Sequence, residues 1–286
     1  MSETEALSTV DYLKSIEGRF PEDILQLGLG MAYAEERKYV SVAVPEELKF
    51  GSLEILHLTD VQWGHVCCNQ KKFIEHRDWL LSEPNRFALF GGDMIDAATL
   101  LSKGTPWENT GPPIEQIYSF CEVVASMRHR ILGYVGGNHE RHVRPTLGRS
   151  AGSFIASFLR IPYSEGQQFI RIQYGAWKPF KINLWHGGGS SQTKGAKAQV
   201  LHRFMLQGDA HLYLIGHLHD AMVLPGWRIK DNVKGRAIGL EKYYGAMSSS
   251  FIEFFGGYAE VKGLSASDTC MAKVTIWPDG KFRVTI

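Results

Sequence analysis

Nine side chains of the kinds that bind divalent cations stand just after five short apolar segments of the chain. They are carboxylates, amides and imidazoles: Asp60, Gln62, Asp93, Asp96, Asn138, His139, His186, His217 and His219. Hard and borderline cations bind oxygen atoms and imidazole nitrogen. A carboxylate can also bridge two ions about 3.5–4 Å apart, as in two-metal hydrolytic sites. These residue types therefore predict a divalent metal centre.

The apolar segments have the length and composition of buried strands. We predict strands over residues 53–58, 86–90, 131–135, 181–185 and 212–215, and helices over 73–81 and 114–127. Strands that alternate with helices predict an α/β fold, in which ligands bind beyond the carboxyl ends of the strands. His217 and His219 are two residues apart, so in an extended segment both can point to one side and reach different ions.

The rest of the chain predicts further elements around this centre. Residues 38–44 read as a strand ended by Pro45, and residues 1–36 as one or two short helices. Beyond Ala221, residues 271–277 and 281–286 predict a hairpin with Asp279-Gly280 in the turn. We expect this region to form a second, more antiparallel sheet that packs on the first. Because no linker is evident, we predict an N-terminal helical extension (1–36) and a single domain (37–286).

Composition and charge narrow the class of protein. The chain has 286 residues, 44% of them hydrophobic and 21% charged, which is typical of a globular protein and excludes a disordered or coiled-coil chain. Its 31 lysines and arginines against 30 acidic residues give a formal charge of +1, which excludes a broad basic field for a long polyanion. Two divalent ions beside Asp60 and Asp93 would supply the positive charge locally.

The cysteines and the N-terminus indicate the compartment. No Cys-x-x-Cys pair occurs among the four cysteines, so neither a disulfide framework nor a zinc knuckle follows; they are Cys67, Cys68, Cys121 and Cys270. The first residues are acidic and lack the apolar stretch of a secretory signal, and no apolar run approaches the roughly 18 residues of a membrane helix. We expect a cytoplasmic protein with reduced thiols and no membrane partner.

Five sequence motifs follow one another between about residues 53 and 220. They are Asp-x-Gln at 60–62, Gly-Asp-x-x-Asp at 92–96, Gly-Asn-His-Glu at 137–140, a single His at 186 and Gly-His-x-His at 216–219. In this order, each after a predicted strand, they resemble the calcineurin-like metallophosphoesterase superfamily. The resemblance implies a four-layer fold with two mixed β-sheets packed face to face and flanked by helices. It also implies a metal-dependent phosphoric ester hydrolase with two divalent cations, for which we favour Mn²⁺ over Mg²⁺, Fe²⁺ or Zn²⁺.

The resemblance further implies roles for individual residues. Asp60 and His219 would bind the first metal, Asp93 would bridge both, and the second would be held by Asn138, His186 and His217. His139 would act as a general acid or phosphate clamp, and Asp96 would hold its tautomer. A hydroxide bridging the metals would attack phosphorus in line.

Gln62 departs from the pattern of this superfamily, whose first motif is normally Asp-x-His. The Gln62 amide oxygen is neutral like imidazole but harder, so as a ligand it would favour manganese or magnesium over zinc at the first site. In a second interpretation Gln62 only holds a water molecule. In a third, His57 or His65 replaces the missing imidazole.

Other polar residues flank the motifs. Lys194 closes a glycine-rich segment (187–195) whose main-chain amides could cradle a phosphate, and Arg141 follows Asn138 and His139, so we predict both as substrate-binding residues. A flexible loop and a solvated positive turn are the structural alternatives. Trp63 could stack on a base, although packing in the core is favoured.

The motifs also bear on the substrate. Protein phosphatases of this superfamily carry arginines where this chain has Ala97 and Val135-Gly136, so a phosphoprotein substrate is disfavoured. The region around residues 84–86 and the glycine-rich segment resemble phage and prophage phosphoesterases of exonuclease-like type. We therefore predict a phosphodiesterase, with a nuclease acting on DNA as the favoured class.

Two alternatives remain for the function. One is hydrolysis of a small nucleotide or a phosphomonoester, and the other is a non-catalytic metal-binding module that docks a partner. A binding module needs neither His139 nor Asp96, so their presence favours an enzyme with a phosphoester substrate, nucleic acid among the candidates. Monomer and homodimer both stay open.

Overall fold

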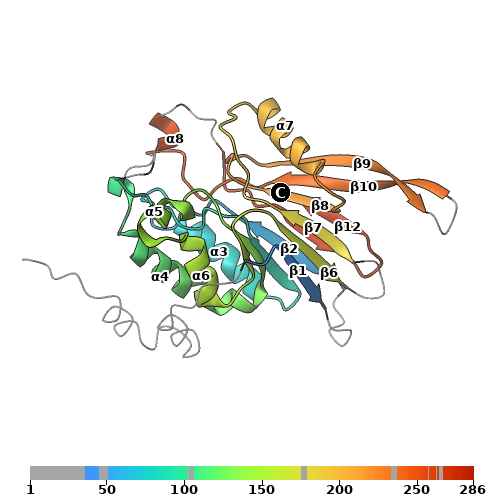
Figure 1. Ribbon diagram of the computed structural model, residues 1–286, viewed down its shortest axis with the longest axis horizontal. Coiled ribbons are helices and arrows are strands. Elements are labelled where there is room, and N and C mark those ends of the chain that lie inside the picture. The colour runs from blue at the N-terminus through green and yellow to red at the C-terminus, as the bar shows by residue number, and fades with distance from the viewer. Residues whose placement is uncertain are drawn as a thin grey trace, which may run out of the picture.

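The computed structural model describes residues 36–44, 51–100, 102, 106–174, 179–232, 237–256, 258–261, 263 and 267–286. The N-terminal helices predicted over residues 1–36 lie outside these residues, apart from Glu36. Two mixed six-stranded sheets dominate the described chain (Figure 1). The predicted α/β fold with two packed sheets is confirmed.

The first sheet has the order β12-β11-β2-β3-β4-β5. Its central strands are parallel to one another, and β11 and β12 add to one edge in antiparallel fashion. The strands are β2 (Leu53–Leu58), β3 (Arg86–Phe90), β4 (Ile131–Val135), β5 (Tyr163–Ser164), β11 (Lys273–Ile276) and β12 (Phe282–Thr285). The carboxyl ends of β2, β3 and β4 therefore meet at one edge of the molecule.

The second sheet has the order β1-β6-β7-β8-β10-β9. Its strands are β1 (Tyr39–Ala43), β6 (Gln168–Gln173), β7 (Phe180–Leu184), β8 (Leu212–Ile215), β9 (Met222–Asn232) and β10 (Ala237–Met247). β7 and β8 are parallel, and β9 and β10 form a long antiparallel hairpin at one side of the sheet. β7 and β8 bring two further polar ends to the same region.

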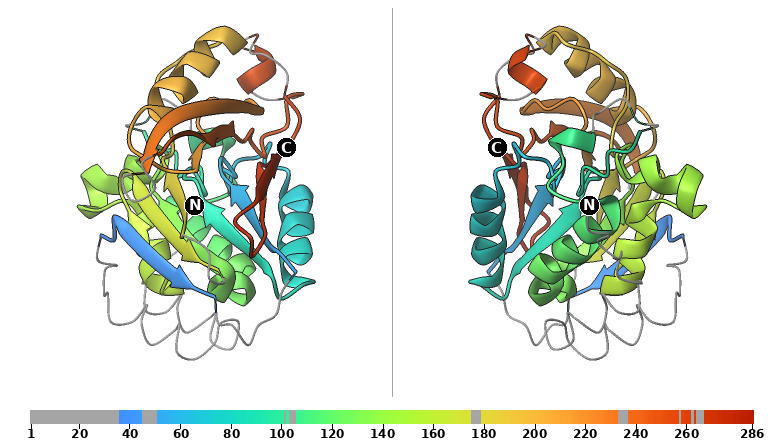
Figure 2. Two further views of the ribbon diagram at one scale, coloured as in Figure 1. Left: turned by 90° about the vertical axis from the view of Figure 1, so that its right-hand side faces the viewer. Right: turned by 90° about the vertical axis from the view of Figure 1, so that its left-hand side faces the viewer.

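Helices cover the outer faces of both sheets (Figure 2). α3 (Gln70–Leu81), α4 (Pro113–Val124) and α6 (Ala151–Leu159) pack on the first sheet, and α7 (Lys194–Met205) packs on the second. Short elements complete the described chain: η1 (Pro106–Glu108), η2 (Ala125–Arg130), η3 (Glu140–Val143), α5 (Arg144–Leu147) and α8 (Tyr258–Val261). No helix within the described ranges is long and apolar enough to cross a bilayer.

The core lies in three layers between these elements. Leu53 and Ile55 of β2 face the second sheet, whereas Leu56 and Leu58 face the helices. A strand that is buried on both faces needs mostly apolar residues, which is why β2, β3, β4 and β8 were recognisable in the sequence. The predicted hairpin at the C-terminus is also confirmed, with Val274 paired to Val284.

The expected second sheet made from the C-terminal region is wrong. β9 and β10 extend the second sheet by pairing with β8, whereas β11 and β12 extend the first sheet by pairing with β2. The tail therefore adds strands to both sheets, because each sheet offers an unpaired strand edge there. The segment 194–205, whose beginning was predicted as a loop, is a helix that Thr193 caps by accepting a hydrogen bond from the Ala196 amide.

Candidate metal centre

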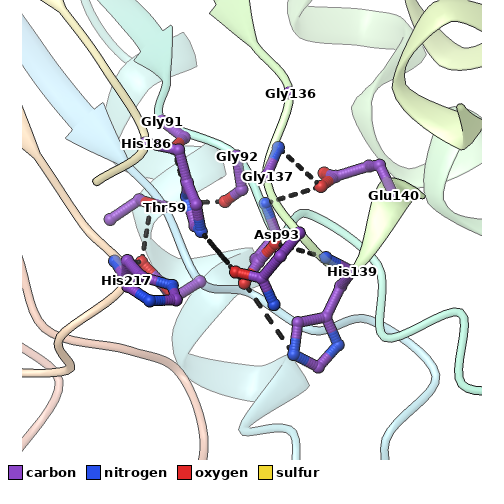
Figure 3. A network of polar contacts seen from close by, with 12 residues as sticks. Thr59, Gly91, Gly92, Asp93, Gly136, Gly137, His139, Glu140, His186 and His217 are labelled. Atoms are coloured by element: carbon purple, nitrogen blue, oxygen red, sulfur yellow. Dashed lines mark hydrogen bonds and ion pairs between the residues drawn. The ribbon is translucent and has the colours of Figure 1, made fainter. Parts of the chain in front are cut away.

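The loops that follow β2, β3, β4, β7 and β8 meet in one polar cluster (Figure 3). Main-chain hydrogen bonds tie these loops together. The Asp60 amide donates to Gly92 O, the Gln62 amide to Asp93 O, and the Gly216 amide to His186 O, each over 2.9 Å. These bonds set the relative positions of the loops that carry the predicted metal-binding residues.

The backbone is strained at the positions predicted to hold metal. Seven non-glycine residues of the described chain have positive φ, and five of them are predicted ligands: Asp60 (51°), Gln62 (49°), Asp93 (52°), His217 (64°) and His219 (47°). Non-glycine residues avoid this region at a cost of about 1–3 kcal/mol each, and such strain gathers at functional sites. The rest of the fold must offset this cost.

One group of ligand atoms gathers around Asp93. Single ligand atoms of Asp93, His186 and His217 lie within 4.8 Å of one another. Nε2 of His186 is 3.1 Å from Asp93 Oδ2 and 3.2 Å from Asn138 Oδ1. These atoms are the donor set of a borderline divalent cation: carboxylate, imidazole and amide oxygen.

A second group lies at Asp60. Oδ1 of Asp60 is buried, accepts no well-directed hydrogen bond within the described chain, and lies 3.1 Å from Nε2 of His219. Oδ2 accepts hydrogen bonds from Thr59 Oγ1 over 2.7 Å and from the His217 amide over 2.9 Å. A buried carboxylate oxygen without such a donor is costly unless a cation binds it, so this group also fits a divalent ion.

His186 joins the two loops that follow β3 and β7. Its Nδ1 is 2.8 Å from Gly91 O, which requires Nδ1–H and leaves Nε2 facing Asp93. Burial lowers the pKa of His186, but the Asp93 carboxylate outweighs burial and raises that pKa to about 9. A cation bound at Nε2 would replace the proton that this raised pKa retains there.

His139 is held away from the ligand atoms by Asp96. Its Nδ1 lies 2.8 Å from Asp96 O and 3.0 Å from Asp96 Oδ1, and its Nε2 lies 3.8 Å from Asp93 Oδ2. Burial lowers the pKa of His139, but Asp93 and Asp96 outweigh burial and raise that pKa to about 10. Without metal the ring is therefore an imidazolium with an Nε2–H on the Asp93 side.

The raised pKa values of His139 and His186 predict an alkaline loss of stability in the metal-free protein. The folded state retains these protons, whereas the unfolded state releases them near the ordinary histidine pKa of 6.5. The stabilisation is therefore complete below about pH 6.5 and is lost as the pH rises through 9 to 10. Thermal unfolding in EDTA across this interval should show the decline.

Manganese should remove the part of this decline that arises from His186, because a coordinating imidazole carries no proton at the bound nitrogen. Parallel unfolding curves with EDTA and with manganese at each pH provide the comparison. The same alkaline decline under both conditions would show that the metal does not replace the His186 proton.

Glu140 is a residue of this cluster whose role the motif alone did not indicate. Its buried carboxylate accepts hydrogen bonds from three main-chain amides, those of Asp93 (2.9 Å), Met94 (2.7 Å) and Gly137 (2.9 Å), and from the Tyr134 hydroxyl (2.8 Å). Glu140 thus joins the loop after β3 to the loop after β4 and sets the backbone of Asp93. The signal was the glutamate that ends Gly-Asn-His-Glu.

Two glycines, Gly137 and Gly216, lie so close to aspartate side chains that no other residue fits at these positions. A Cβ atom at Gly137 would overlap the Asp93 carboxylate, and one at Gly216 would overlap Oδ2 of Asp60. Any side chain there would displace an aspartate. The glycines in Gly-Asn-His-Glu and Gly-His-x-His therefore follow from packing against the two carboxylates.

Gln62, His57 and His65 are the three candidates for the second ligand of the first motif, and their surroundings differ. Gln62 is buried in the same turn as Asp60. His57 is buried with Nδ1 2.9 Å from Ser248 Oγ, and burial lowers its pKa to about 3, so it stays neutral. Nδ1 of His65 accepts from the Cys67 amide over 3.0 Å, and Nε2 lies 3.8 Å from Glu108. These contacts direct His65 toward its own loop and Glu108.

The predicted substrate-binding residues are engaged with acidic neighbours. Nη2 of Arg141 donates to Glu165 O over 2.6 Å, and Nε lies 3.6 Å from Glu165 Oε2. The exposed Lys194 ammonium is 3.7 Å from Asp220 Oδ1. Their roles in substrate binding stay predictions. Trp63 packs in the core and donates its indole N–H to Ser119 Oγ, as favoured from the sequence.

Comparison with known proteins finds similarity in structure but no match in sequence. No family model matches the sequence, and no curated protein matches it. A conserved uncharacterized protein from Streptococcus pneumoniae TIGR4, described as a predicted phosphoesterase, is 14% identical, with a TM-score of 0.35 over 82% of this chain and 98% of that chain. A metallophosphoesterase from Sphaerobacter thermophilus is 13% identical, with a TM-score of 0.36 over 82% and 88%.

A protein serine/threonine phosphatase from Saccharomyces cerevisiae is 10% identical, with a TM-score of 0.37 over 95% of this chain and 90% of that chain. At these identities and TM-scores, the resemblances by themselves assign neither an activity nor a substrate to this chain.

Proposed function

We propose that this chain is a binuclear metal-dependent phosphoesterase that cleaves phosphodiesters, with DNA as the favoured substrate class. One observation carries the proposal: His139 lies beside the two groups of potential ligand atoms, at Asp93 and Asp60, but is a member of neither group. Asp93 contacts His186 on one side and the main chain and ring of His139 on the other. A simple metal-binding module would not need the second contact.

The donor atoms divide into two proposed sites. Asp60 and His219, with Gln62, would hold one cation, and the other would be held by Asn138, His186 and His217, with Asp93 shared between them. The bound cations would supply Lewis-acid charge and lower the pKa of a nucleophilic water. Because the chain as a whole carries a formal charge of only +1, this local charge would attract the phosphate.

His139 would supply the proton chemistry. Nδ1 of His139 lies 3.0 Å from Asp96 Oδ1, a contact that would fix the tautomer and leave Nε2 to face the reacting phosphate group. Protonated at Nε2, His139 donates a hydrogen bond to a phosphoryl oxygen or a proton to the leaving oxygen. Two cations nearby would lower the pKa of His139 from its metal-free value, toward the range in which a general acid works at neutral pH.

Hydrolysis of bis-p-nitrophenyl phosphate tests the proposal. The protein stripped with EDTA should be inactive, and manganese should restore activity together with two bound ions per chain by elemental analysis. Metal binding without turnover would support the alternative of a non-catalytic module. A protein that retains no stoichiometric transition metal after manganese loading would contradict both interpretations.

The substrate class needs a separate screen. Single-stranded DNA, duplex DNA, RNA and cyclic dinucleotides should be compared at saturating manganese, with p-nitrophenyl phosphate to detect a monoesterase. Faster cleavage of DNA than of the other substrates would support the favoured class. A preference for p-nitrophenyl phosphate or for a small nucleotide would instead favour the phosphomonoester and nucleotide alternative.

Gln62 should make the first site the weaker of the two. An amide oxygen binds borderline cations less tightly than imidazole nitrogen, so manganese should activate better than zinc. Gln62→His should then lower the manganese concentration needed for half-maximal activity. The rate at saturating metal could fall, because imidazole donates more electron density and leaves the cation a poorer Lewis acid.

A manganese titration of activity for both forms measures this effect. Gln116→His is a suitable control for the substitution itself, because Gln116 is also buried but its side chain is bound to Ala97 N and Gly111 O. Superimposed titration curves for wild type and Gln62→His would show that residue 62 is not a ligand.

A further inference from the structure

The hairpin of β9 and β10 projects beyond the remaining strands of both sheets (Figure 1). We call residues 226–231 of β9 together with residues 238–243 of β10 the hairpin arm. The β9–β10 ladder is regular over its full length, from Met222 opposite Met247 to Asn232 opposite Ala237. The arm is thus a formed structural element that extends away from the body of the protein.

The two faces of the arm differ in composition. Side chains alternate between faces along a strand, and directly paired residues share a face. Tyr244 packs against Phe282 between the sheets, with ring centroids 5.6 Å apart, and so marks the inner face. The inner face then consists of three paired rows: Lys242 with Trp227, Leu240 with Ile229, and Ile238 with Asp231.

The apolar residues of this inner face are largely exposed. The exposed fractions are 59% for Trp227, 74% for Ile229, 71% for Leu240 and 78% for Ile238. The arm borders an open groove of about 1620 Å³, whose far wall includes Phe282 and Val284 of β12. Contiguous apolar side chains on a soluble protein mark an interaction surface.

The charged and aromatic side chains of the outer face contact one another. Arg228 lies 3.4 Å from Glu241 and 4.2 Å from the centre of the Tyr243 ring, and Lys230 lies 3.6 Å from Glu241. β9 is also an edge strand, paired on one side only within the described sheets. An uncovered partner surface is therefore confined to the inner face and the free edge.

The charged residues of the inner face are complementary to those of a second, antiparallel copy of the same face. Lys242 lies in the row nearest the body, Asp231 in the row nearest the tip, and the aliphatic pair Leu240 and Ile229 lies between them. If two inner faces meet antiparallel, the aliphatic rows coincide, and the cationic row of each copy faces the anionic row of the other. A surface that is complementary to itself in this way is the requirement for a two-fold interface.

We propose that the inner face of the hairpin arm forms a two-fold symmetric homodimer by packing against the same face of a second copy. Leu240 and Ile229 are the central apolar anchors, and Asp231 with Lys242 of the opposite copy fixes the antiparallel orientation. The three exposed aliphatic side chains Leu240, Ile229 and Ile238 favour a protein partner over a polyanion, for which this face would offer only the exposed Trp227 ring and Lys242, 5.4 Å from that ring. The inference is independent of the proposed catalytic function.

Sedimentation velocity of the full chain over a wide range of protein concentration tests the dimer. The wild type should sediment as a dimer, and Ile229→Lys with Leu240→Lys should raise the dissociation constant by about 30-fold or more, the scale for losing a central anchor. Leu206→Lys is the matched control, because Leu206 is an apolar residue exposed elsewhere, on the segment after α7. This control should remain dimeric.

The double variant should keep its fold, because both changed side chains point into solvent, and circular dichroism checks this whether or not the protein is an enzyme. Activity on a small diester, if present, should also be unchanged. The reason is distance from the candidate site. Ile229 is seven residues along β9 from Met222, the end of the strand that follows His219, which is about 23 Å at ~3.3 Å per residue. A monomeric wild type, or a folded double variant that stays dimeric, would overturn the proposal.

Charge reversal provides the test of orientation. Lys242→Asp and Asp231→Lys should each weaken the dimer, since each places like charges in facing rows, and the two changes together should restore it. If Lys242→Asp leaves the dimer intact but weakens binding of a single-stranded oligonucleotide, the groove is a polyanion site and the dimer interface is refuted.

Discussion

His139→Ala should lower the rate of phosphodiester hydrolysis by about 10²–10⁴-fold at saturating manganese and leave the metal content unchanged. Nε2 of His139 is 3.8 Å from Asp93 Oδ2, and Nδ1 is committed to Asp96. We therefore expect the ring to contribute a proton or a hydrogen bond rather than a bond to a cation. Single-turnover rates and elemental analysis on the same sample measure the two effects separately.

His142→Ala is the matched control for this experiment. The His142 ring lies beside His139, with centroids 4.9 Å apart, and burial lowers the pKa of His142, so it stays neutral where His139 is protonated. We expect a much smaller change in rate from His142→Ala. A parallel loss of metal and rate in His139→Ala would identify His139 as a ligand and refute its role as an acid.

Asp93→Asn should abolish activity and reduce the metal content below two ions per chain. Asparagine has nearly the shape of aspartate and tolerates the left-handed backbone that Asp93 adopts, with φ of 52°. The substitution therefore removes little besides the negative charge proposed to be shared by both cations. Metal affinity should fall by more than the 10–100-fold that loss of an outer hydrogen-bond partner causes.

Isothermal titration with manganese, paired with the diesterase assay, measures this loss. Asp209→Asn is the control, because Asp209 is an exposed carboxylate that pairs with Lys181 at the surface. Two ions bound with wild-type affinity in Asp93→Asn would show that the two sites do not share this carboxylate.

The sequence alone determined the strands that carry the site. β2, β3, β4 and β8 are buried largely on both faces, so most of their residues are apolar, and a glycine or polar residue follows each strand. The types of the polar residues at those ends, together with the order of the motifs, were enough to predict a divalent metal centre. The chemistry of carboxylate, amide and imidazole does not depend on the fold.

Elements with weaker local patterns were missed. α7 buries Leu201, Phe204 and Met205 but begins in a glycine-rich segment, so its start looked like a loop. The division of the C-terminal strands between two sheets could not be foreseen either. Strand pairing depends on which edges are free after the rest of the chain has folded, and β10 and β11 carry no residue that identifies their neighbours β8 and β2.

Only the tertiary structure decided how the site residues are held. Nothing in Asp60, Asp93 or His217 as residue types favours positive φ over ordinary backbone; hydrogen bonds from loops distant in sequence impose it. The raised pKa of His139 likewise follows from its distances to Asp93 and Asp96, and the role of Glu140 from the loop amides that it binds. A sequence specifies which groups are present, but pKa and strain arise from through-space contacts, which exist only once the two sheets have packed.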